Sequence, residues 1–76
     1  MLEKKLERIM NEIRKYNEIM EEKIDYQKDL GKSIIIEMSL NNKEDVEMMQ
    51  KEYKEISKEI NQIKAKLVKL WEKYGL

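Results

Sequence analysis

Cysteine, histidine and proline are absent from this chain of 76 residues, and glycine occurs only as Gly31 and Gly75. Without cysteine the chain has no disulfide framework and no thiolate metal site. Without histidine it lacks the commonest zinc ligand and the commonest general base. The near-absence of helix breakers favours long helices. We therefore expect an all-α protein with no catalytic residue, no metal ligand and no cofactor.

Long apolar runs are missing as well. The longest run is Ile34-Ile35-Ile36, far short of the ~20 residues that a membrane-spanning helix needs. The N-terminal segment MLEKKLERIM mixes charged with apolar residues, unlike the apolar region of a signal peptide. Sixteen basic and sixteen acidic residues leave a net charge of zero, which disfavours long-range attraction to nucleic acid or anionic lipid. We expect a cytoplasmic protein with no membrane contact.

What the chain does contain is charge, at 42% of its residues, in a pattern typical of coiled coils. In its second half, apolar residues recur at steps of three and four, a heptad register that continues over four repeats. Asn41 followed by Glu44 fits a capping box at the start of this segment, with Asn42 as an alternative cap. Gly75 is placed to end it. The pattern predicts a helix over about 43–74.

The first half has the same spacing with two irregularities. Steps of four at Tyr16, Met20 and Ile24 form a stutter, which straightens a supercoil locally. Gly31 and the β-branched residues at 34–36 lower the helix propensity. We expect a helix over about 2–39 that is kinked near Gly31, with a complete break there as the alternative.

The segment 40–42 between these helices either reverses the chain or continues one long rod. If the chain reverses between Asn41 and Asn42, residue i faces residue 83 − i. Nearly every core position then meets an apolar partner, with Ile60 near Ile24, while Ile56 meets the polar Gln27. A continuous rod would instead place polar groups in the apolar stripe. The prediction is a single domain, residues 1–76, folded as an antiparallel two-helix hairpin. The expected helix–helix core comprises Ile9, Ile13, Tyr16, Met20, Ile24, Leu30, Ile34, Met49, Tyr53, Ile56, Ile60, Ile63, Leu67, Leu70 and Tyr74.

More apolar residues remain than one seam can bury. The surplus, a candidate surface for oligomerisation or for a partner, comprises Ile19, Tyr26, Ile35, Ile36, Leu40, Met48, Val68 and Trp71. Because a lone hairpin lacks a layered core, we expect it to form a homodimer with a four-helix bundle, or to bind a helix of another protein. The function hypothesis is a structural or regulatory protein–protein interaction module acting through helix faces. Trp71 is expected to pack on Leu2, Leu6 or Met10, or to anchor a partner.

Two charged clusters suggest other functions. Carboxylates gather on the first helix at Glu18, Glu21, Glu22 and Asp25, but di-metal bundles pair such residues with histidine, so we interpret them as a solvated face. Near the C-terminus the chain carries Lys64, Lys66, Lys69 and Lys73 together with Trp71 and Tyr74. Lysines for phosphates and a tryptophan for base stacking would suit a nucleic-acid-associated accessory protein. That is the alternative hypothesis; complementation of the helix dipole is the simpler explanation of the lysines.

The stretch VEMMQKEYKEI, Val46 to Ile56, resembles the second helix of the small sporulation phosphatases that act on response-regulator aspartyl phosphate. Those proteins are also short helical hairpins. Their signature has serine and aspartate where this chain has Gln50 and Lys54, and the resemblance covers this stretch alone. It implies, as a third alternative, a small regulator of a signalling protein.

Overall fold

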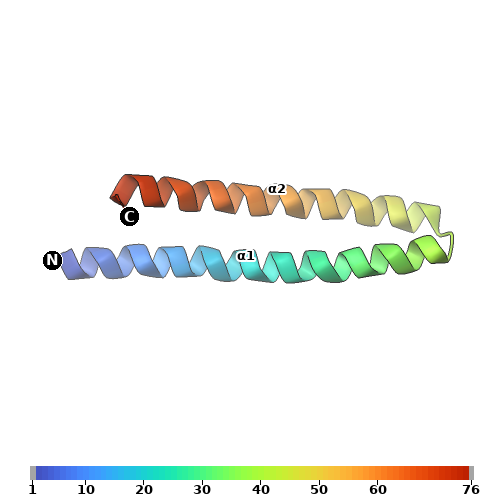
Figure 1. Ribbon diagram of the computed structural model, residues 1–76, viewed down its shortest axis with the longest axis horizontal. Helices are drawn as coiled ribbons and strands as arrows, with labels where there is room; N and C mark the ends of the chain where they lie inside the picture. The colour runs from blue at the N-terminus through green and yellow to red at the C-terminus, as the bar shows by residue number, and fades with distance from the viewer. Residues whose placement is uncertain (1, 76) are drawn as a thin grey trace.

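The computed structural model describes residues 2–75, which form two helices, α1 (Leu2–Ser39) and α2 (Lys43–Tyr74). The helices lie side by side and run in opposite directions, so both ends of the chain lie at the same end of the molecule (Figure 1). The molecule is a rod of 60 × 15 × 13 Å. The predicted antiparallel all-α hairpin is confirmed. Within residues 2–75, neither helix is apolar over a length that could cross a bilayer.

The chain reverses through a helix C-cap built on Asn41. This residue has a φ of 59°, in the left-handed region. Its N–H donates to the carbonyl of Met38 at 3.2 Å, and the N–H of Asn42 donates to the carbonyl of Glu37 at 3.1 Å. These two bonds define a Schellman motif, in which asparagine takes the left-handed position that glycine usually occupies. Asn41 therefore ends α1.

The predicted capping box is wrong. Asn42 occupies the N-cap position of α2, but its side chain makes no capping hydrogen bond. Its Nδ2 instead donates to Oε2 of Glu37 at 2.6 Å, because the reversal brings the carboxylate at the end of α1 beside it. A hydrogen bond to a charged acceptor is stronger than one to a neutral group. The side chain of Asn42 thus ties the turn to α1.

Helix α1 continues through Gly31 without the break considered above. A Cβ atom at Gly31 would lie 3.7 Å from Cε2 of Tyr53, an ordinary contact distance. Glycine inside a helix costs about 1 kcal/mol relative to alanine. Packing of an apolar face on another helix contributes more to helix stability than propensity does. Leu30, directly before Gly31, is buried in the main apolar cluster, and this contact holds α1 against α2.

The core is a single seam between the helices. Its main cluster joins Leu30, Ile56 and Ile60, with Met20, Ile24, Ile34 and Met49 packed around them. Within residues 3–75, five apolar side chains are buried, namely Ile9, Leu30, Ile56, Ile60 and Ile63. The other residues of the expected core are half-buried, except Tyr53, which stays 39% exposed. No described side chain is fully enclosed, since each helix has only one neighbour within the chain.

The two glycines are expected to respond to alanine in opposite directions. Gly31→Ala should raise the free energy of unfolding by roughly 0.5–1 kcal/mol, because the helical conformation is retained and the new methyl group has room. Gly75 has a φ of 67°, so Gly75→Ala should lower it, by up to about 1 kcal/mol. Urea denaturation of both variants measures the two differences. A loss of stability in Gly31→Ala would show that Tyr53 cannot accommodate the methyl group.

Candidate interaction surface

Along one long edge of the hairpin, here called the polar edge, side chains of α1 contact side chains of α2. On α2 these contacts involve every seventh residue, so they lie on one side of that helix. Lys23 Nζ lies 2.7 Å from Oε2 of Glu59. The Tyr26 hydroxyl donates to the carboxylate of Glu52, and the ammonium of Lys66 lies 5.8 Å from the ring centroid of Tyr16. Six side chains of this edge, three from each helix, are therefore already engaged within the hairpin.

The contact at Tyr26 changes its ionisation. The hydrogen bond to Glu52 has the largest effect, followed by the negative charge of Glu52 and then by desolvation, and all three raise the pKa of Tyr26 above its ordinary value of 10.0. Each favours the neutral phenol over the phenolate. The Tyr26 proton is therefore held more tightly in the folded chain than in the unfolded one.

Gln27 supplies the polar contact at the middle of the seam. Its Nε2 donates to the backbone carbonyl of Tyr53 at 3.1 Å and to the hydroxyl of Ser57 at 2.6 Å. Ser57 is one residue from Ile56, the partner expected for Gln27. If the two helices slid relative to each other, Gln27 would lose both hydrogen bonds within the apolar seam, so these bonds disfavour any other pairing of the helices. Gln27 thus helps to set the register of the two helices.

The opposite edge carries an apolar groove near the ends of the chain. Its volume is about 510 Å³. The apolar lining consists of Leu6, Ile9, Met10 and Ile13 from α1 and Trp71 from α2, and the polar lining consists of Arg14, Asn17, Glu18 and Glu21. Met10 is 59% exposed and Trp71 49% exposed. We call these nine residues the apolar groove, and the side of the rod that contains it the groove edge.

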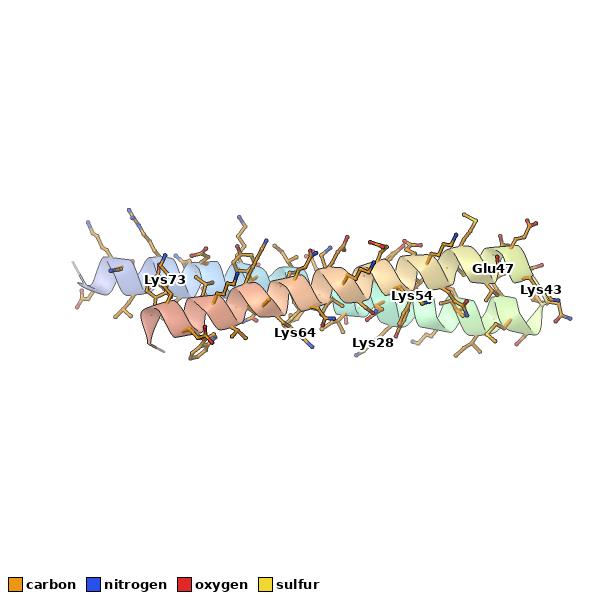
Figure 2. The ribbon with its side chains drawn as sticks, turned by 90° about the horizontal axis from the view of Figure 1, so that it is seen from above. Lys28, Lys43, Glu47, Lys54, Lys64 and Lys73 are labelled. Atoms are coloured by element: carbon orange, nitrogen blue, oxygen red, sulfur yellow. The ribbon has the colours of Figure 1, made fainter. Side chains whose placement is uncertain are left out.

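The heptad register explains why Met10 and Trp71 share an edge. Met10 directly follows the core residue Ile9, and Trp71 directly follows the core residue Leu70. In an antiparallel pair, residues at this heptad position of the two helices lie on the same side of the seam. Trp71 also lies seven residues after Lys64. Figure 2 places Lys64 and Lys73 on opposite sides of α2, which separates the groove edge from the polar edge.

The sequence-predicted surface residues do not form one patch. Ile19 is half-buried. Seven are exposed, namely Tyr26, Ile35, Ile36, Leu40, Met48, Val68 and Trp71. Trp71 lines the apolar groove, whereas Tyr26 lies on the polar edge with Glu52. Leu6 and Met10 belong to the groove but were not part of the predicted surface. Their position beside the seam, level with Trp71, could have indicated that they share a surface with it. The contact expected between Trp71 and the Leu2 side chain lies outside the described residues.

The basic segment is divided between the two edges. Lys66, Lys69 and Lys73 line a second groove with Glu12, Tyr16 and Leu70. The ammonium of Lys73 lies 5.5 Å from the ring centroid of Tyr74. Trp71 lines the apolar groove instead, so it does not stand among these three lysines. The combination that motivated the nucleic-acid hypothesis is not assembled on one surface.

The acidic residues of α1 are also spread over the surface. Glu18 and Glu21 line the apolar groove, while Glu22 lies on the polar edge with Lys23 and Glu59. Among residues 2–75, no three acidic side chains converge as metal ligands would.

Comparison with protein-family models, curated proteins and solved structures returns no match. The resemblance of Val46–Ile56 to the sporulation phosphatases gains nothing from these comparisons. At the two positions where that family has serine and aspartate, Gln50 and Lys54 line a shallow groove beside Gly31 and Tyr53. Function has to be inferred from the surface of the hairpin itself.

The raised pKa of Tyr26 predicts a loss of stability at high pH. Its contribution is fully present below the unfolded pKa of 10.0 and is lost as the pH rises through the higher folded value. Urea denaturation between about pH 8 and about pH 11 should show the stability advantage of the wild type over Tyr26→Phe shrinking. All other side chains are the same in the two proteins and cancel in the difference. Glu52→Gln removes the partner charge and should weaken the effect, and a difference that is independent of pH would contradict the contact.

Proposed function

We propose that this protein is a helical interaction module, which acts by offering the groove edge to another helix and carries out no catalysis. The observation that supports this best is the apolar groove, where Trp71 is half exposed beside Met10 and Leu6. Tryptophan is enriched among the residues that dominate the binding energy of protein interfaces. Docking of an amphipathic helix into an apolar groove is a common mode of recognition.

The thinness of the seam supports the same function. Among the side chains that the structure describes, five apolar ones are buried and eleven large apolar ones are exposed, including Met10, Trp71 and Met48. Small domains bury a limited share of their surface, and a two-helix hairpin has no second layer to cover its outer faces. A helix placed along the groove edge would supply that layer.

The polar edge is a poorer docking surface. Covering it would remove water from the Lys23–Glu59 ion pair and from the Tyr26–Glu52 hydrogen bond. Desolvation of such a pair costs free energy that its own attraction does not always recover. Covering the apolar lining of the groove edge does not require such desolvation, so the partner helix is expected there. A structural or regulatory role in the cytoplasm is the setting we propose for this binding.

The alternatives have less support. For nucleic acid, three lysines form a stripe, but Glu12 lies among them and two of them lie over tyrosine rings. Trp71, the residue suited to base stacking, belongs to the other edge. For a phosphatase-like regulator, the positions of the family's serine and aspartate carry Gln50 and Lys54.

Site-specific photo-crosslinking in the native host tests the proposal. The photoreactive residue p-benzoylphenylalanine at Met10 should give discrete adducts, because a partner helix lies against the apolar groove. At Asn11, the next residue along α1, it should give little adduct, since this exposed side chain points away from the seam. Gel electrophoresis after irradiation compares the two yields. Equal yields at the two positions would remove the groove edge as the binding surface.

A further inference from the structure

We infer that the apolar groove is occupied by a second copy of this chain, so that Trp71 of each copy enters the groove of the other. This inference rests on the proposed function, and it names both the partner and the anchor residue. The result would be a four-helix bundle made from two hairpins, joined along their groove edges.

The apolar groove is self-complementary because it contains both a projection and a recess. Trp71 is 49% exposed at one side, and the recess beside it has a volume of about 510 Å³ with Leu6, Met10 and Ile13 in its lining. Both features lie at the same level along the rod, since Trp71 itself lines the groove. A twofold axis parallel to the rod therefore brings each Trp71 against the recess of the other copy. In this arrangement α1 of one copy lies antiparallel to α2 of the other, the usual relation in such bundles.

One more exposed apolar residue, Ile35, lies on the groove edge nearer the turn. Ile35 follows the half-buried core residue Ile34, as Met10 follows Ile9, and it is 66% exposed. The 25 residues from Met10 to Ile35 correspond to about seven helical turns, so the two side chains point the same way. A partner that covers both must span about 38 Å, more than half of the 60 Å rod, whereas a short helical peptide would cover the apolar groove alone.

The size of the groove edge also suits a second copy. One face of the rod measures 60 by 15 Å, or about 900 Å², close to the ~800 Å² that each partner buries in a stable interface of standard size. The side chains on this edge carry both signs of charge. Arg14 stands with Glu18 and Glu21 in the apolar groove, and Figure 2 shows Lys28 and Lys64 on the same side of the rod. Because the chain has no net charge, net charge causes no long-range repulsion between two copies.

Sedimentation equilibrium on the purified chain tests the inference. The wild type is expected to have twice the mass of the 9.3 kDa chain. Met10→Glu and Trp71→Ala, which alter the two sides of the apolar groove independently, should each raise the dissociation constant by roughly 30-fold or more. Met48→Glu is the matched control, because Met48 is 70% exposed on the outer face of α2, and it should dimerise as the wild type does. Circular dichroism confirms that each variant keeps its helices.

The fluorescence of Trp71 gives a second readout. Its emission should shift to shorter wavelength as the concentration of wild type or Met48→Glu rises, and it should stay unshifted in Met10→Glu. A helical wild type that remains monomeric, or a dimer that Met48→Glu weakens as much as Met10→Glu does, would overturn the inference. If the chain is monomeric but the Met10 photo-adduct in cells contains a different protein, the interaction function stands and the second copy is wrong. A monomer without any adduct removes both.

Discussion

The left-handed backbone of Asn41 is the constraint on which the rest of the molecule depends. With a φ of 59° at this residue, α1 ends in a Schellman motif and the chain reverses within three residues. The reversal sets which residues of α1 and α2 lie opposite each other. A reversal between the two asparagines pairs residue i with residue 83 − i. The observed contacts of Lys23 with Glu59 and of Gln27 with Ser57 each differ from this pairing by one residue. A turn one residue longer would shift every one of these contacts.

Once the register is set, the two edges of the hairpin differ in what they can bind. On the polar edge, Lys23 and Tyr26 already have partners on α2. On the groove edge, Met10 and Trp71 remain about half exposed, and residues 2–75 contain no third helix that covers them. A hairpin whose polar edge is already bonded and whose groove edge is exposed favours binding of a partner at the groove edge. This asymmetry connects the fold to the function that we propose.

The helices and their pairing could be predicted because apolar spacing of three and four is a strong periodic signal. The chemistry of the turn could not, since asparagine is favoured both before a helix and in the left-handed position after one, and only the reversed chain brings Asn42 to Glu37. Gly31 stays helical because α2 packs against α1 there, and helix propensities, which depend on the local sequence alone, do not include such packing. Tyr53 is more exposed than its seam position implied because it lies over Gly31, which has no side chain to enclose it. Met10 was expected beside Trp71 but was not counted in the candidate surface, because a residue next to the seam looks the same in sequence whether the neighbouring helix covers it or leaves it exposed.

Each molecule folds back on itself, and a distance measured between its two ends tests this most directly. Spin labels at Arg8 and Lys73, both exposed, can be measured by double electron–electron resonance in a sample diluted with unlabelled chain. Adjacent helices lie 8–10 Å apart, so with the length of the label arms the hairpin predicts a distance below about 30 Å. A single continuous helix would separate the two labels by about 98 Å at 1.5 Å per residue, and a distance near that value would contradict the account.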